Sequence, residues 1–209
     1  MDHDTRIDER LVRMIVDLVA GTQVDGRAQR QRVDDVPHVG VAHRREGVAA
    51  EQASRAHDAP VAVAATLSFG NAMSSLTDFL FSGVLVRFPT LKLAYSEGQI
   101  GWIPYILERA DDVWLEHRAW GGVRDIVPEP PSTYYYRQVY GCFFRDRHGV
   151  ESLDTIGVDN TTFETDYPHT DSTWPHTKKV AQELMAGLPD DVVYKLVRGN
   201  AIRMLELDL

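Results

Sequence analysis

Three short apolar runs, each followed directly by polar residues, constrain the fold of this 209-residue chain more than any other feature. They are LKLAYSEG (91–98), VYGCFF (139–144) and TTFETD (161–166). Each run has the length of a buried strand, and the segments between the runs are long enough for helices. Because parallel strands need crossovers of that length, the pattern predicts an α/β protein with a parallel sheet.

The segments around these runs carry helical patterns. Apolar residues keep helical spacing up to Phe88, which predicts one long helix with Asp58 as its N-cap. A second helix is expected before Gly121-Gly122, a short one within 148–157, and a helical tail from Lys178 onward. The expected order is therefore helix and strand in alternation.

The N-terminal part of the chain has a different composition. Residues 21–58 contain Val and Ala but no Leu, Ile, Phe, Met, Trp or Tyr. A segment without large apolar residues cannot build much core. We therefore predict two parts: an atypical, weakly structured segment 1–57 and a folded part 58–209.

Charge and cysteine content exclude several classes of protein. The net charge of −9 argues against a nucleic-acid or anionic-membrane partner, because neutralising phosphates requires clustered Lys and Arg. The single cysteine, Cys142, excludes an internal disulfide framework and a Cys-rich zinc site. His and carboxylate side chains remain as metal ligands. No signal peptide or spanning helix is visible, so a cytoplasmic location is expected.

Polar side chains that suit metal or acid–base chemistry follow the first and third runs. Glu97 comes after the first, and Asp166 and His169 come after the third. The carboxyl ends of parallel strands meet at one edge of a sheet, where α/β proteins place their chemistry. Two prolines restrict the loop after Asp166, so we expect His169 and Asp171 to project near the same edge.

Four motifs in order carry a resemblance to a known family. They are FPTLKLAYSEGQIGWIPYILERADDVW (88–114), VYGCFF, FETDYPHTDSTWP (163–175) and GNAIRMLEL (199–207). From Asp58 onward the chain resembles the amidohydrolase-related family of metal-dependent TIM barrels, which includes aminocarboxymuconate-semialdehyde decarboxylase and resorcylate-type decarboxylases. The resemblance implies a partial (β/α)8 TIM barrel, about strands five to eight, with the N-terminal half missing or degenerate.

The resemblance also implies roles for three residues. Asp166 would end strand eight as a metal ligand or as a base beside the metal-bound water; taken alone, an Asp before Tyr-Pro is a common turn residue. Glu97 stands where other members carry a catalytic histidine, and it would transfer protons or, alternatively, cap the helix near Ile100. His169 would contact substrate or the metal's surroundings, or be an exposed loop histidine.

Other ligands of the family's metal centre are not recognisable. The chain contains no His-x-His pair, which the family uses on strand one. The strand-five motif, His-Ile-Gly, has a counterpart in His38-Val39-Gly40, so His38 is a candidate metal ligand if this segment is native. The alternative is that residues 21–58 are an out-of-frame translation of the strand-five region.

Two functions are compatible with these observations. The first is a metal-dependent hydrolase or non-oxidative decarboxylase of a small organic acid or cyclic substrate, with zinc as the expected ion. The second is a catalytically inactive remnant that acts, if at all, through self-association or partner binding. In either case a partial barrel would leave strand edges unpaired, so a homo-oligomer is expected.

The frameshift hypothesis makes a prediction about the coding DNA. Codons GCA, CAT and CGG for Ala42, His43 and Arg44 would encode His-Ile-Gly if read one nucleotide later. Sequencing the locus and translating all three frames should then reveal His-Ile-Gly and, upstream, the two-histidine motif. Absence of both motifs from every frame would favour a native N-terminal segment.

Overall fold

The computed structural model of the chain describes residues 61–67, 69–117 and 119–208. The chain divides into two units, Met1–Asn71 and Ala72–Leu209. The described part of the first unit contains α4 (Val61–Leu67) and the first residues of α5 (Gly70–Phe81). His38 and the boundary predicted at 57/58 lie outside the described residues.

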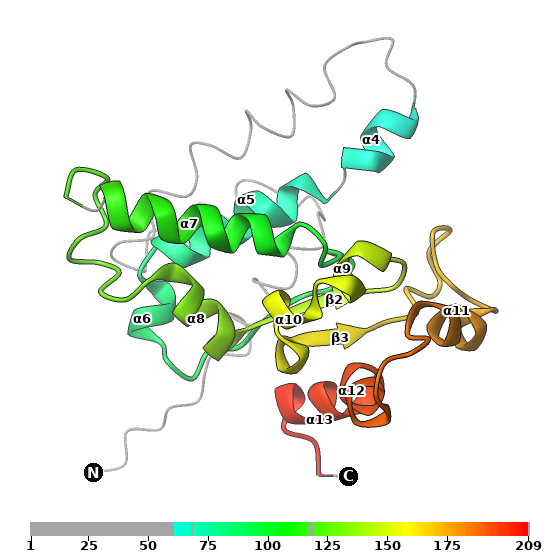
Figure 1. Cartoon of the computed structure of the whole chain (residues 1–209). Coiled ribbons are helices and arrows are strands. Elements are labelled where there is room, and N and C mark those ends of the chain that lie inside the picture. Colours follow the sequence, from blue (N-terminus) through cyan, green and yellow to red (C-terminus); the bar gives the residue numbers. More distant parts are fainter. Residues whose placement is uncertain (1–60, 68, 118, 209) are drawn as a thin grey trace, which may run out of the picture. The chain divides into compact units, whose positions relative to one another are not determined.

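A three-stranded parallel sheet is confirmed at the three apolar runs. Its strands are β1 (Leu93–Tyr95), β2 (Val139–Phe143) and β3 (Thr161–Phe163), in the order β1-β2-β3. In Figure 1 the arrows of β2 and β3 point the same way, toward the loop after β3.

The strands are staggered. Tyr95, the last residue of β1, lies opposite Gly141, which in turn lies opposite Thr161, the first residue of β3. A shift of this kind from strand to strand is a property of tilted strands in a barrel.

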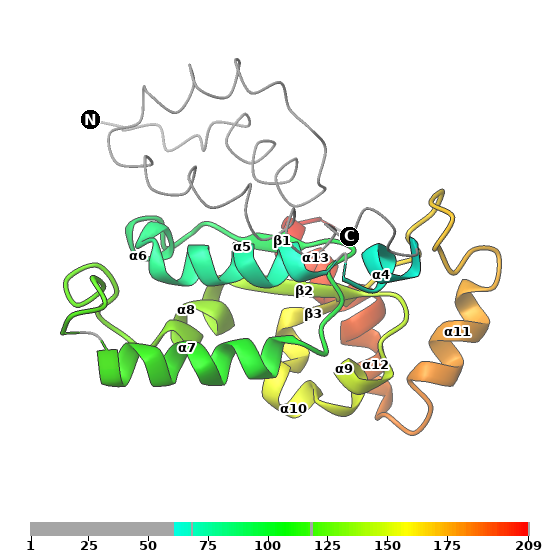
Figure 2. The ribbon, with the colours of Figure 1, turned by 90° about the horizontal axis from the view of Figure 1, so that it is seen from above.

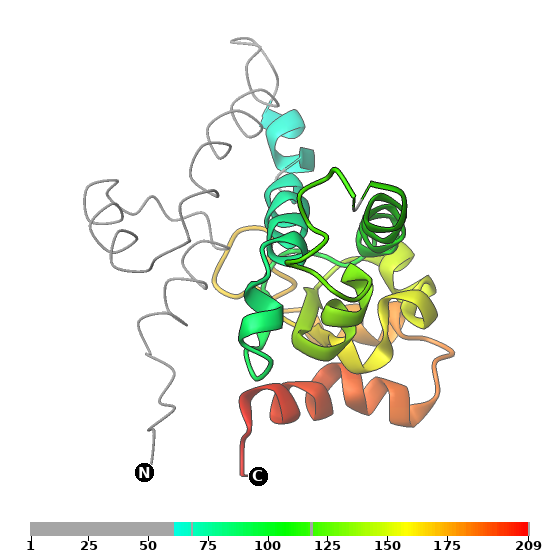
Figure 3. The ribbon, with the colours of Figure 1, turned by 90° about the vertical axis from the view of Figure 1, so that its left-hand side faces the viewer.

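Helices connect the strands, as predicted. Figures 2 and 3 show α7 and α8 next to each other, and Figures 1 and 3 place α12 and α13 at the opposite end of the unit from α7. Within the described residues, no helix is both long and apolar enough to cross a membrane. The remaining helical segments are α6 (Val84–Arg87), α7 (Ile103–His117), α8 (Pro131–Gln138), α9 (Arg147–Glu151), α10 (Leu153–Ile156), η2 (Val158–Asn160), α11 (Thr177–Leu184), α12 (Asp190–Tyr194), η3 (Lys195–Gly199) and α13 (Asn200–Leu205).

The single long helix predicted from Asp58 to Phe88 is wrong, because α4, α5 and α6 are separate helices. Helix α5 ends at Phe81 and α6 begins at Val84, with Gly83 between them at φ 74°. A Cβ at Gly83 would lie 2.5 Å from the Ile126 side chain, so the chain turns where only glycine fits. Helix α8 was not predicted from the sequence, although its Pro131 occupies the first turn, where proline is favoured.

One face of the sheet builds the core against α7. Leu93, Tyr95, Val139 and Phe143 are each at most 2% exposed. At Gly141 an added Cβ would lie 2.7 Å from Ile100 Cγ2, so the glycine allows the segment before α7 to approach the sheet closely. The sheet therefore presents its carboxyl ends beside the start of α7.

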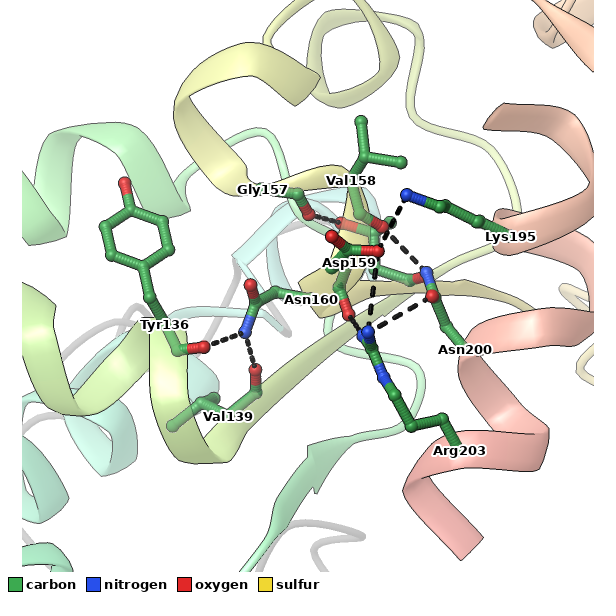
Figure 4. A network of polar contacts seen from close by, with 10 residues as sticks. Tyr136, Val139, Gly157, Val158, Asp159, Asn160, Lys195, Asn200 and Arg203 are labelled. Carbon is green, nitrogen blue, oxygen red and sulfur yellow. Dashed lines mark hydrogen bonds and ion pairs between the residues drawn. The ribbon is translucent and has the colours of Figure 1, made fainter. Parts of the chain in front are cut away.

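Buried side-chain amides hold the amino ends of the strands. Asn160 donates to the carbonyl oxygens of Val139 (2.9 Å) and Tyr136 (3.0 Å), and Asn200 donates to those of Thr161 and Val158, both at 2.7 Å. Figure 4 shows both amides between the strands and the helices. Because buried carbonyl groups are costly without donors, these bonds fix where β2 and β3 begin.

Gln138 anchors the segment before β1 in the same way, through its side-chain amide. Its side-chain amide donates to the carbonyl oxygens of Phe88 (2.8 Å) and Leu91 (3.1 Å). The ion pairs of Asp159 with Lys195 (3.0 Å) and Arg203 (3.5 Å), also in Figure 4, are half-exposed. Pairs of that exposure contribute little, so the amides are the stronger anchors.

We predict that Asn200→Ala lowers the free energy of unfolding by about 2–3 kcal/mol, because two carbonyl oxygens lose their donor. Urea unfolding followed by circular dichroism would measure the change. The matched control is Gln182→Ala, which removes an exposed amide from α11 and should change stability by less than about 0.5 kcal/mol. Equal effects of the two substitutions would contradict this account of the anchors.

Candidate metal centre

Three side chains meet at the carboxyl ends of β1 and β3. Glu97 lies two residues after β1, Asp166 lies three residues after β3, and His169 lies in the loop that follows. One carboxylate oxygen from each acid and one ring nitrogen of His169 all lie within 4.8 Å of one another. The structure therefore brings together three of the four residues singled out from the sequence.

The distances within this cluster are short. His169 Nδ1 lies 2.6 Å from Asp166 Oδ1 and 3.4 Å from Glu97 Oε1. The Asp166 side chain is only 6% exposed, whereas those of Glu97 and His169 are 47% and 59% exposed. A buried carboxylate thus lies at the base of the cluster, and the other two groups face solvent.

Glu97 and Asp166 both have left-handed backbone conformations. Their φ angles are 59° and 57°, values that are unfavourable for residues other than glycine. Such conformations cost of order 1–3 kcal/mol and persist only where surrounding contacts enforce them, often at functional sites. The Asp166 carbonyl accepts the His169 backbone N–H at 3.0 Å, which closes a turn and returns the imidazole toward the carboxylate.

The loop that carries His169 is closed at its base. Thr173, which is 1% exposed, donates its backbone N–H (3.0 Å) and its hydroxyl (3.2 Å) to the carbonyl oxygen of Thr165. These two bonds join the ends of the segment between them. The position of His169 is therefore fixed by the backbone as well as by its contact with Asp166.

The cluster has an excess of negative charge. Burial raises the pKa of Glu97, and the Asp166 carboxylate raises it further. The hydrogen bond with Asp166 raises the pKa of His169, and the Glu97 charge adds to the effect. The contributions of the neighbouring carboxylates to both shifts have the same sign: they favour a proton at this place, and burial separately favours the neutral form of Glu97.

The alternative of Glu97 as a helix cap does not fit the contacts. The backbone N–H groups of Ile100 and Gly101 donate to Asp146 Oδ2, at 2.8 and 2.6 Å. Asp146 was not singled out from the sequence, because it lies about 45 residues away in the chain. Asp171 is exposed and does not belong to the three-residue cluster.

A third carboxylate beside the cluster, that of Glu164, was also missed from the sequence. Its Oε1 accepts the backbone N–H of Glu97 at 2.6 Å. One feature of the sequence could have indicated it. Glu164 lies two residues before Asp166, and alternate residues of an extended strand point to the same face of the sheet.

A sequence profile of the amidohydrolase family matches residues 1–207. The chain therefore belongs to the amidohydrolase family. A search of curated proteins found no match.

Solved structures share part of the fold. An amidohydrolase from Mycobacterium avium subsp. paratuberculosis K-10 is 20% identical (TM-score 0.59; 70% of this chain and 36% of that chain covered). The 5-carboxyvanillate decarboxylase of Sphingomonas paucimobilis is 22% identical (TM-score 0.57; 75% and 45%). A dihydroxybenzoic acid decarboxylase from Polaromonas sp. JS666, with bound manganese and 2-nitroresorcinol, is 20% identical (TM-score 0.51; 68% and 41%). The match covers less than half of each of these chains.

We predict that the pKa of His169 in the metal-free chain lies above the ordinary value of about 6.5 and falls in Asp166→Asn. The sign follows from linkage: a raised pKa adds stability that is fully present below about pH 6.5 and lost as pH rises through the folded value. NMR titration of the imidazole Cε1 proton would measure both variants. Asp171→Asn removes a charge from the same loop and should leave the His169 pKa nearly unchanged.

Proposed function

We propose that this chain supplies about strands five to eight of the (β/α)8 barrel of a metal-dependent amidohydrolase-family enzyme, and that the enzyme removes CO2 from a small aromatic or cyclic carboxylic acid. The observation that carries the proposal is the convergence of Glu97, Asp166 and His169 at the carboxyl ends of β1 and β3. Two of the similar solved structures are decarboxylases of aromatic acids, which favours decarboxylation over hydrolysis.

The cluster fits a divalent cation. Zinc binds His nitrogen and carboxylate oxygen at about 2.0–2.2 Å, so its ligand atoms lie within roughly 4.4 Å of one another. The 4.8 Å spread of the present atoms needs only a small adjustment. Asp166 and His169 would hold the ion, and His38 could add a further ligand. When bound, the ion would polarise a substrate oxygen and stabilise negative charge. Nitrogen and oxygen donors suit zinc and also manganese, the ion in the Polaromonas structure.

Glu97 is the proton-transfer group in this proposal. Its carboxyl group would donate a proton to the ring carbon that bears the carboxylate. The C–C bond to the carboxylate then breaks, its electron pair returns to the ring, and CO2 leaves. Glu97 recovers its proton from water. Burial raises the pKa of Glu97, which favours its protonated form, and its partial exposure lets it exchange a proton with solvent.

His169 has an alternative role. The sequence reading placed it as a substrate contact rather than a ligand, and the ring is exposed enough to serve as one. The metal content of His169→Ala separates the two roles, because only a ligand is needed for the ion to bind.

We predict that the purified full chain binds one Zn²⁺ or Mn²⁺ ion, and that Asp166→Asn weakens binding by at least about 100-fold, more than loss of an outer-sphere contact does. Isothermal titration calorimetry and elemental analysis would measure both. A wild-type chain that binds neither ion would favour the inactive remnant, which would act, if at all, through self-association or partner binding.

We further predict that Glu97→Gln keeps the ion but lowers kcat of CO2 release by about 10²–10⁴-fold, the usual contribution of a general acid. Release would be measured with 2,6-dihydroxybenzoate as the probe and metal-loaded chain. Asp171→Asn is the control and should change kcat little. Loss of the ion in Glu97→Gln would make Glu97 a ligand rather than the proton donor.

A further inference from the structure

Glu164 connects the carboxyl ends of the strands. Its own backbone N–H donates to the Phe143 carbonyl at 3.0 Å, which extends the pairing of β3 with β2 by one residue. Its side chain reaches in the other direction and accepts the Glu97 backbone N–H at 2.6 Å. One residue thus touches β2 through its backbone and the end of β1 through its carboxylate.

The same carboxylate also meets β2 through a side chain. Burial raises the pKa of Glu164, and the hydrogen bonds that its carboxylate accepts from the Glu97 backbone N–H and the Cys142 thiol lower that pKa in part. Burial raises the pKa of Cys142 as well, and the Glu164 charge raises it further, so the thiol keeps its proton and can act as donor. Cys142 is 7% exposed, which places this contact inside the protein.

The turn that carries Glu97 is strained, so its conformation depends on the hydrogen bond to Glu164. Glu97 and Gln99 both have left-handed φ angles, 59° and 53°, on either side of Gly98. The turn begins with a single weak backbone bond, from the Gly98 N–H to the Tyr95 carbonyl at 3.3 Å. A 2.6 Å bond from the Glu97 N–H to a carboxylate is far stronger, because the acceptor carries charge.

The geometry points to Glu164 as a positioning residue: by accepting the backbone N–H of Glu97, it holds the Glu97 carboxylate toward His169 and Asp166. The three-residue cluster consists of Glu97, Asp166 and His169 and does not include Glu164, so Glu164 acts through Glu97 and not on the ion or substrate. The role of the Glu97 position in catalysis rests on the proposed function. The hydrogen bond between Glu164 and Glu97 does not depend on that function.

Three variants of Glu164 test this role in the full chain. Glu164→Gln keeps an oxygen acceptor at the same reach, Glu164→Asp keeps the charge but is one methylene shorter, and Glu164→Ala removes the acceptor. Hydrogen exchange of the Glu97 amide, followed by ¹⁵N NMR without metal, is the first measurement. Mn²⁺ affinity by calorimetry is the second. Asp171→Ala, which removes an exposed carboxylate from the same loop, is the matched control.

We expect exchange of the Glu97 amide to accelerate by about tenfold or more in Glu164→Ala and Glu164→Asp, and to stay within about threefold of wild type in Glu164→Gln. Mn²⁺ affinity should stay within about threefold of wild type in all three variants, because Asp166 and His169 are the proposed ligands and Glu164 acts only through Glu97. The control should match wild type in both measurements.

Wild-type exchange in Glu164→Asp, or exchange in Glu164→Gln as fast as in Glu164→Ala, would overturn the proposal. If Glu164→Ala fails to fold, the comparison of Glu164→Gln with Glu164→Asp still decides it. A wild-type chain that binds no Mn²⁺ would remove the proposed function but leave the exchange measurements valid.

Discussion

The structure depends on buried side-chain amides that satisfy backbone carbonyl groups at the amino ends of the strands. Gln138, Asn160 and Asn200 are 2%, 7% and 2% exposed, and each donates to carbonyl oxygens at the start of a different strand or in the segment before it. Because a buried carbonyl without a donor is costly, these bonds set where each strand begins. At the carboxyl ends, by contrast, acidic side chains collect and accept backbone N–H groups, as Glu164 does from Glu97.

Different interactions therefore stabilise the two ends of the sheet. Neutral amides anchor one end, while the other concentrates Glu97, Glu164 and Asp166 around one imidazole. Like charges at this density oppose folding unless something offsets them. Part of the offset comes from backbone N–H groups and from His169, whose ring nitrogen lies 2.6 Å from Asp166. The left-handed turns at Glu97 and Asp166 belong to the same arrangement, since they aim both carboxylates at that ring.

Local sequence patterns predicted the sheet and the residues of the cluster. Each apolar run became a strand because it was short, buried and followed by polar residues, and the parallel order then placed Glu97 and Asp166 at one edge. The prediction failed where structure depends on distant partners. Gly83 interrupts a helical pattern because Ile126 occupies the space beside it. Glu164 contacts Glu97 across 67 residues, so no local spacing could reveal that bond.

The electrostatics of the cluster also constrain how an ion would bind. A proton on His169 and a metal ion on the same ring nitrogen exclude each other, because a ligand nitrogen must be unprotonated. In the proposed site, with His169 as a ligand, the contact that holds its ring against Asp166 would be exchanged for coordination of the same ion. Such a change would need only a small movement of the His169 ring, because its Nδ1 already lies within 3.4 Å of oxygens from both Glu97 and Asp166. In that proposal the ring of His169, 59% exposed, would be the group that reorients, because the Asp166 side chain is only 6% exposed.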